Sequence, residues 1–404
     1  MPKFKFKAKD LNGKVIRGLF FAKDEEDLRE IVDNLDYFLI SSRKIAESSQ
    51  IFTFLEKIKV EDISLFCRQL AIMVSSGLEL KTAIDVLKNG TKNPKLKEIL
   101  EVAHHDLLQG KSLSSSFAKY PKTFPLFFRN MIRIGEISGK FPLVLNKLAD
   151  YYDKDNKIKR KAKSALAYPI MLVCMAIVVL IIMAVFVMPT FKDVFDDMGA
   201  ELPQITIMVI GFTDFIRNNI LLLLLGFIGF IALWLFLKRF PSVRLYIDKL
   251  KLKVPIVKDV NIALITSRFT SGFQTLLSSS IPIVEAIETM SHLLGNMYVE
   301  EQMKVCASEI KRGESIAKSL ETIGIFPSML CEMIRVGEET GRIEEVLTHV
   351  TEYFENEVDQ AFKKMTGAIE PIMILIIGGI VVVCLLAVFL PMLEITSAID
   401  SIET

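Results

Sequence analysis

The stretch MIRIGEISGKF at residues 131–141 returns almost unchanged as MIRVGEETGRI at residues 333–343. The same offset of 202 residues carries Phe124-Pro125 onto Phe326-Pro327. With an offset of 203, FCRQLAIMVSSGLELKTAIDVL from Phe66 meets FTSGFQTLLSSSIPIVEAIETM from Phe269, so one residue is lost in a loop between the two matches. Similarity at a nearly fixed offset over this length indicates an internal duplication.

Three apolar blocks account for much of the 51% apolar content of the chain. They lie at residues 167–189, 219–238 and 368–393, and a bilayer span takes about 20 residues of helix. Core helices keep a polar stripe, which these blocks almost lack, so we expect three transmembrane helices. The first and third blocks each follow one copy of the duplication. The second has no counterpart and is interpreted as a return crossing that gives both copies the same orientation.

Charge around the blocks predicts their orientation. Basic residues crowd KDNKIKRKAK at 154–163 and KRFPSVRLYIDKLKLKVPIVK at 238–258, whereas the loop at 190–218 and the tail at 394–404 are acidic. Because positive flanks stay in the cytoplasm, we expect a multi-pass protein of the cytoplasmic (inner) membrane. Its N-terminus would be cytoplasmic and its C-terminus extracytoplasmic.

The fold class expected from these patterns is a mainly α, integral membrane protein. Apolar residues at helical spacing predict two repeated cytoplasmic bundles of about six helices each, at 60–166 and 239–367. Residues 1–48 differ, because KFKFKAKDLNGKVIRGLFFA alternates around Asn-Gly as in a β-hairpin. A helix at KDEEDLREIVDNL and a third strand at YFLISSRKI would complete a small α+β domain.

The repeated motif superficially resembles a phosphate-binding loop, but its spacing does not fit one. A Walker A loop has four residues between its glycines and then Lys and Ser/Thr, whereas only three residues separate Gly135 from Gly139, and Phe141 follows Lys140. No strand precedes the motif either. We therefore interpret it as a helix–turn–helix joint.

The joint makes specific predictions for eight residues. Gly139 and Gly341 would end a helix in a positive-φ conformation, and Gly135 and Gly337 would allow close helix packing. An Arg and a Glu at i, i+3 would be close enough to pair. These potential pairs are Arg133 with Glu136 and Arg335 with Glu338. Whether the two glutamates serve the fold or contact a partner is left open.

The membrane segments carry few features of chemical interest. Four prolines, interpreted as helix kinks or punctuation, lie at the edges of the first and third spans: Pro169, Pro189, Pro371 and Pro391. The only charge is Glu370 at the inner edge of the third span, where a carboxylate can reach the interface. Pumps and carriers usually need buried ionisable groups, so this pattern disfavours them.

No catalytic constellation is apparent, so no enzyme activity, cofactor or metal is expected. The five cysteines form no CxxC pair, and the net charge of +1 gives no reason to expect nucleic acid as a partner.

The ordered set of motifs resembles the type II secretion protein F and type IV pilus inner-membrane platform family. The motifs are KIKVEDISLFCRQLAIMVSSGLEL, the doubled RIGEISGK and RVGEETGR, the YP and EP entries to two spans, and KDLNGKVIRG. Copy two has Ser280 where the family usually has Gly, and copy one has Glu79 where Pro is common. Both departures concern local turns.

This resemblance implies a non-enzymatic platform in the lipid bilayer. The implied partners are a hexameric secretion ATPase on the cytoplasmic side, pilin or pseudopilin transmembrane helices, other inner-membrane assembly proteins and further copies of the chain, with a dimer as the expected state. The rival hypothesis is a small-solute transporter or channel component, and a membrane-bound enzyme ranks third. The sequence does not separate pilus biogenesis from type II secretion.

Overall fold

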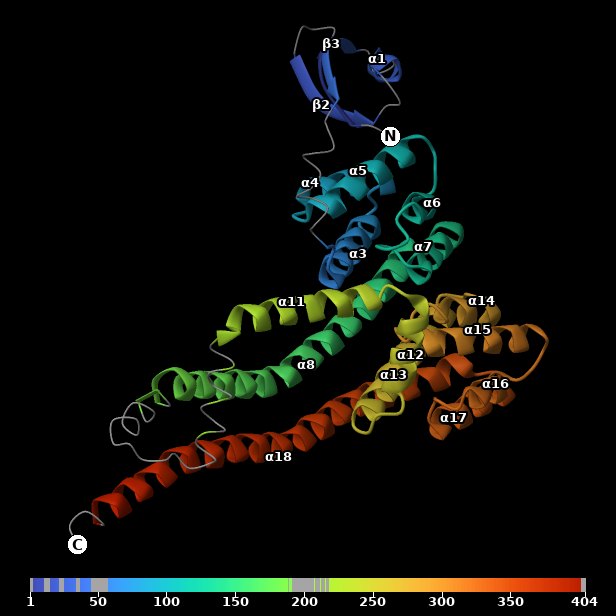
Figure 1. Ribbon diagram of the computed structural model, residues 1–404. Helices are drawn as coiled ribbons and strands as arrows, with labels where there is room; N and C mark the ends of the chain where they lie inside the picture. Colours follow the sequence, from blue (N-terminus) through green and yellow to red (C-terminus); the bar gives the residue numbers. More distant parts are fainter. Residues whose placement is uncertain are drawn as a thin grey trace.

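The computed structural model of the protein describes residues 3–10, 15–21, 25–33, 37–44, 57–187, 189–190, 207, 211, 215 and 218–400. These residues form a small N-terminal α+β unit, two helical bundles and long helices that leave the bundles side by side (Figure 1). The predicted outer loop at 190–218 falls almost wholly outside the described residues, as does the end of the tail.

The N-terminal unit has the predicted hairpin, helix and third strand. Its elements are β1 (Lys3–Asp10), β2 (Val15–Phe21), α1 (Glu25–Asp33) and β3 (Tyr37–Lys44). The antiparallel sheet has the order β2-β1-β3. Alternation in β1 turns Phe6 and Ala8 toward Leu28 and Val32 of α1, and these four side chains form a separate core. The Asn-Gly turn lies outside the described residues.

The two copies of the duplication fold into the same succession of helices. Copy one comprises α3 (Val60–Ser75), α4 (Leu80–Gly90), α5 (Pro94–Leu108), α6 (Leu113–Ala118), α7 (Leu126–Ser138) and α8 (Phe141–Ile182). Copy two comprises α13 (Val257–Leu277), α14 (Ile283–Met290), α15 (Met297–Lys311), α16 (Ile316–Ile323), α17 (Ser328–Thr340) and α18 (Ile343–Asp400). Between them lie the π-helical turn η2 (Met183–Val187), α11 (Ile220–Leu237) and α12 (Pro241–Lys251). Each copy thus has the predicted six helices, and α12 is an additional helix at the start of the range 239–367 predicted for the second bundle.

Equivalent residues begin equivalent helices. The side-chain oxygen of Asn93 accepts a hydrogen bond from the backbone of Lys95 (3.1 Å) in α5, and Asn296 does the same for Val299 (3.1 Å) in α15. Ser112 and Ser315 likewise cap α6 and α16. Such caps satisfy backbone N–H groups that the helix itself leaves without partners, so the duplicated sequence fixes the same helix starts twice.

One hydrophobic core runs through both bundles. It is dominated by aromatic and branched aliphatic side chains, among them Phe117, Phe124 and Phe128 of copy one and Phe269 and Phe273 of copy two. Leu148 and Tyr151 of α8 belong to the same core as residues of α13 and α14. The bundles are therefore packed on one another rather than joined only by a linker.

The last helix of each bundle continues into an apolar segment, as predicted. Within the part of the chain that the structure describes, two helices, α8 with η2 and α18, are long and apolar enough to cross a membrane, and almost none of their most apolar stretches is buried. A soluble core helix would be largely buried, so this exposure favours the membrane interpretation. The second predicted span coincides with the entirely apolar α11.

The prolines do not punctuate these helices in the way that the sequence suggested. Helix α8 continues through Pro169, and α18 continues through both Pro371 and Pro391 to Asp400. Only before Pro189 is the regular pattern altered, where the α-helix gives way to the π-helical turn η2. Membrane helices tolerate proline because small local adjustments satisfy the freed backbone groups, and a π-turn is one such adjustment.

A tight turn follows the first long helix of each bundle, and it has glycine in copy one but serine in copy two. Gly77 has φ +85, and its counterpart Ser280 has φ +64. A left-handed conformation costs an L-residue about 1–2 kcal/mol, and glycine avoids this cost. About half of that gain is offset, because glycine is more flexible than serine in the unfolded chain.

Replacing Ser280 by glycine is therefore expected to stabilise the protein by about 0.5–1 kcal/mol. Thermal unfolding of the full-length protein in detergent, followed by circular dichroism, measures the effect. The matched control is Ser278→Gly, two residues earlier at φ −65, where glycine brings no relief and is expected to destabilise. Equal shifts for the two variants would contradict this account.

Candidate functional site

The repeated joint has the predicted backbone in both copies. Gly139 follows α7 with φ +68, and Gly341 follows α17 with the same angle. A Cβ atom placed on Gly135 would lie 2.9 Å from the ring of Phe141, and one on Gly337 would lie 3.0 Å from the Cα of Ile343. The first glycine of each motif therefore lets the next helix cross closely, and the second reverses the chain.

The two glutamates of the motif bind the start of a short helix in their own bundle. Glu136 accepts hydrogen bonds from the backbone N–H groups of Leu113 and Ser114 in α6 and from the Ser114 hydroxyl. Glu338 accepts from the N–H groups of Ile316 (3.0 Å) and Ala317 (3.4 Å) in α16 and from the Ser315 hydroxyl (2.7 Å). A carboxylate at a helix N-terminus satisfies free donors and complements the helix dipole. Each glutamate thus ties together two helices of its bundle.

The predicted pairing of arginine with glutamate inside the motif is wrong. Arg133 instead pairs with Glu285 of α14 in the other bundle, and Arg335 pairs with Glu321 of α16. The i, i+3 spacing allowed the predicted pairs, but the glutamates are occupied by backbone donors. The arginine of the motif therefore contacts the other bundle in copy one, but a helix of its own bundle in copy two.

Polar contacts between the bundles line the packed face of α7 and α8. The Asn130 side chain donates to the Thr289 hydroxyl (2.9 Å), and Arg268 of α13 pairs with Asp155 (3.4 Å). Further along, two lysines of α8 pair with acids of α18 at similar sequence separations: Lys154 with Glu355 (2.7 Å) and Lys161 with Asp359 (2.6 Å). Because the later lysine of α8 pairs with the later acid of α18, the two helices run parallel, toward the same side.

Burial changes the ionisation of several groups at this contact. It lowers the pKa of Lys147, whose ammonium donates to the backbone carbonyl of Ser278 in α13. Burial also raises the pKa of the Tyr151 hydroxyl, and the nearby Asp155 adds to the effect, so this phenol stays neutral. These groups fasten two helices together, and their environment offers no sign of a reacting centre.

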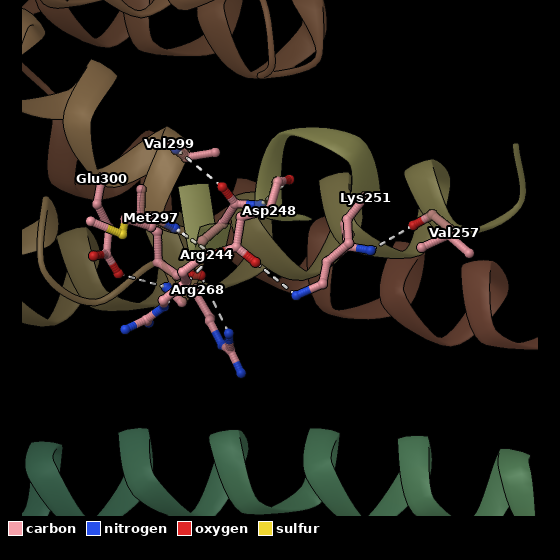
Figure 2. Close-up of polar contacts among 12 residues, drawn as sticks. Arg244, Asp248, Lys251, Val257, Arg268, Met297, Val299 and Glu300 are labelled. Atoms are coloured by element: carbon pink, nitrogen blue, oxygen red, sulfur yellow. Dashed lines mark hydrogen bonds and ion pairs between the residues drawn. The ribbon is translucent and has the colours of Figure 1, made fainter. Parts of the chain in front are cut away.

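Sequence reasoning missed Asp248, which anchors the extra helix α12 to copy two. The carboxylate is buried and accepts a hydrogen bond from the Met297 N–H (3.0 Å) at the start of α15, and it pairs with Lys251 (2.7 Å) of α12 (Figure 2). The Asn296 side chain donates to the backbone carbonyl of Asp248 (3.0 Å). An isolated Asp in a basic segment gives no signal in the sequence, because its partners at the start of α15 lie 48 and 49 residues away.

Glu370 lies where the two long helices leave the bundles. It lines a cavity of about 190 Å³ between α8 and α18, together with Tyr168 and Pro169. Its side chain is exposed, as expected of a carboxylate at the edge of a span. Of the four prolines, Pro169 lines this cavity with Glu370, and Pro371 directly follows Glu370 in α18.

Gly341→Val is expected to destabilise the protein by about 1 kcal/mol or more, because a β-branched residue resists a positive φ. Gly341→Asn is the matched control, since asparagine tolerates this conformation and should cost less. Thermal unfolding of the two full-length variants gives the comparison. Equal stability of the valine variant and the unchanged protein would refute the role of Gly341 in ending α17.

Comparison with protein families matches both copies separately. The model described as "Type II secretion system (T2SS), protein F" covers residues 66–189 and again residues 269–391. The starts of the two matches are 203 residues apart and the ends 202, in agreement with the duplication. The chain belongs to the type II secretion system protein F family.

Full-length relatives come from both branches of this family. The chain is 31% identical to the type IV pilus assembly protein PilC of Thermus thermophilus over 99% of its own length and 100% of the relative's. It is 30% identical to PilC of Myxococcus xanthus over 98% of its own length and 96% of the relative's. For the type II secretion system protein F of Vibrio cholerae the identity is 29%, over 98% and 99% of the two chains.

This family membership gives the general function. The protein is a membrane-bound platform protein of the type IV pilus and type II secretion class, and it is not an enzyme. The transporter and enzyme alternatives are thereby set aside. The resemblance seen in the motifs is confirmed across the whole chain.

Proposed function

We propose that the protein couples a cytoplasmic secretion ATPase to the insertion or removal of pilin or pseudopilin subunits at the inner membrane. In this account the two bundles receive the motion of the ATPase, a hexamer in such machines. The long helices carry it to the transmembrane helices of the subunits. Other inner-membrane assembly proteins and further copies of the chain, expected as a dimer, complete the platform.

The observation that carries the proposal is the continuity of α8 and α18. Helix α8 has 42 residues and α18 has 58, which at 1.5 Å per residue is about 63 Å and 87 Å. Each helix begins in the packed core of its bundle and continues into an exposed apolar stretch. Because no loop intervenes, a rotation or shift of a bundle must move the apolar part of its helix as well.

The proposed orientation of the chain in the membrane rests on the basic residues that flank its apolar segments. Lys154 and Lys161 lie on the part of α8 that remains in the bundle region, so the bundles belong on the cytoplasmic side. The apolar segments of α8, α11 and α18 would then provide three spans and leave the C-terminus extracytoplasmic. Two copies with one orientation require an even number of crossings between them, which α11 supplies as the second.

For the joints, we propose a structural role rather than a partner site. The carboxylates of Glu136 and Glu338 already accept three hydrogen bonds each within their bundles. Next to them, Ile137 is 75% exposed although it is apolar. This side chain, rather than the glutamate beside it, is the better candidate for a contact with another protein.

The coupling can be tested by weakening α8 where it leaves the bundle. Lys163, Ser164 and Ala167 are all exposed there. A variant with glycine at all three positions should weaken the local helix by about 2 kcal/mol. It is expected to reach the membrane at normal levels but to lose fibre assembly or protein secretion in a host that lacks its own copy.

The matched control carries alanine at Lys163 and Ser164, which removes the same side chains but keeps the helix. It is expected to support assembly. If the glycine variant assembles fibres as well as the alanine variant does, α8 does not transmit motion and the coupling proposal fails.

Deletion of the chain decides between the two branches of the family. Loss of fibres would indicate pilus biogenesis, and loss of secreted proteins would indicate type II secretion.

A further inference from the structure

The contact between the two bundles joins different faces of the two copies. Copy one uses α7 and α8, with Asn130, Arg133 and Tyr151 among the contacting side chains. Copy two uses α13, α14 and the side of α18 that carries Glu355 and Asp359. A two-fold arrangement would use the same face of each copy. A contact between unlike faces is head-to-tail, and it leaves one unused face at each end.

The unused face of copy one can be located from the alignment of the repeats. Arg268 and Thr289 of copy two contact copy one, and an offset of 203 places their counterparts at Leu65 of α3 and Val86 of α4. The Arg268 side chain is 21% exposed and Thr289 is fully buried, whereas Leu65 is 58% and Val86 45% exposed. Ile72, two turns along α3 from Leu65, is 60% exposed. Copy one therefore presents an apolar face where copy two is covered.

The unused face of copy two follows from the offset of 202. Tyr151 of copy one is only 6% exposed and lies against Gly272 of α13, but its counterpart Tyr353 is 46% exposed. Asn130, which contacts α14, corresponds to the exposed Glu332 of α17. The tyrosine at this place in the fold is thus covered in copy one and exposed in copy two.

The parallel course of α8 and α18 decides what fits these faces. The two helices leave their bundles side by side in the same direction (Figure 1), and parallel repeats are related by an axis along the membrane normal. A further copy placed by the same operation would keep its own helices in the same membrane. A peripheral partner has no membrane helices that this parallel arrangement would place in the same membrane.

We infer that the chain assembles head-to-tail with itself, the α17–α18 face of copy two docking on the α3–α4 face of copy one in a neighbouring chain. In a dimer this contact would occur twice. The inference deepens the homo-oligomer of the proposed function, and it names the surface that forms it.

Cysteine pairs test the contact in membranes that contain the full-length chain. Within one chain, Asn130 and Thr289 are hydrogen-bonded. Their counterparts in the repeat are Glu332 and Val86, so Glu332→Cys in one chain and Val86→Cys in the next should come close enough for a disulfide. Co-expression of the two single variants is expected to give a crosslinked dimer under mild oxidation. The buried Cys67, Cys306 and Cys331 should not compete, because burial raises the pKa of each thiol and blocks access. Cys174 and Cys384 would be changed to serine.

Two controls define the result. Asn130→Cys with Thr289→Cys in one chain should form an intramolecular disulfide, which shows that the geometry permits one. Glu332→Cys with Val305→Cys in separate chains should crosslink at least tenfold less, since Val305 is 54% exposed but lies on α15, away from the proposed contact. No crosslink at Glu332 and Val86, or equal crosslinking with Val305, would overturn the inference.

Charge on the apolar face gives an independent test. Leu65→Glu with Ile72→Glu is expected to reduce the crosslink at least tenfold, while Val305→Glu leaves it unchanged. An oligomer that survives both acidic substitutions would mean that another protein covers this face, and the inference would be wrong. Crosslinking does not depend on fibre assembly, so loss of fibres with the crosslink intact would count against the coupling alone.

Discussion

Gly337→Val is expected to lower the free energy of unfolding by about 3 kcal/mol, because even the Cβ would lie 3.0 Å from the backbone of Ile343. The two further methyl groups of valine then have no room between α17 and α18, and the backbone cannot yield without opening the joint. Gly337→Ala adds only the Cβ and gains about 1 kcal/mol of helix propensity, so its net effect should stay within about 1 kcal/mol. Thermal or chemical unfolding of the full-length protein in detergent gives the values.

The matched control for this prediction is Gly90→Val at the end of α4. A Cβ there meets nothing within 4 Å, so the free energy of unfolding should change by less than about 1 kcal/mol. If valine costs the same at the two positions, the close crossing of α17 and α18 does not explain why the motif has glycine there.

Glu338→Ala is expected to cost about 2–3 kcal/mol, because three donors at the start of α16 lose a charged acceptor. Glu338→Gln keeps one acceptor oxygen and should cost about half as much. The neighbouring Glu339 is exposed at the end of α17, and Glu339→Ala should change stability by no more than about 0.5 kcal/mol.

The same variants settle whether Glu338 also contacts a partner. If its role is structural, loss of stability and loss of fibre assembly or secretion will rise together from glutamine to alanine. A variant that unfolds like the unchanged protein but assembles no fibres would instead show a role in binding. Glu136 of copy one is expected to follow the same pattern, since its carboxylate accepts from the two equivalent backbone N–H groups at the start of α6, although its hydroxyl donor is Ser114.

Much of the fold could be predicted from the duplication, because helical spacing and capping residues act over a few positions. Gly139 and Gly341 end their helices as expected, since a positive φ is a local property that glycine signals. The six helices of each bundle and the N-terminal hairpin follow from similar local patterns. The prolines were less informative, because α18 satisfies its backbone around Pro371 without a break.

The contacts that join distant segments could not be predicted. Arg133 has a glutamate three residues away, yet it pairs with Glu285 about 150 residues later, and the choice depends on how the two bundles pack. Asp248 and its partners in α15 are a second case. Only comparison of Tyr151 with Tyr353 in the folded chain reveals that one copy is covered where the other is open.

Site-specific photocrosslinking in cells tests the central claim, transmission of motion from an ATPase through the bundles, most directly. A photoreactive residue at Ile137 samples the exposed end of the first joint, and one at Met171 samples the exposed apolar part of α8. We expect capture of the secretion ATPase from Ile137 and of a pilin or pseudopilin from Met171, in cells that assemble fibres. A series of positions over both bundles that never captures the ATPase, while fibres still assemble, would contradict it.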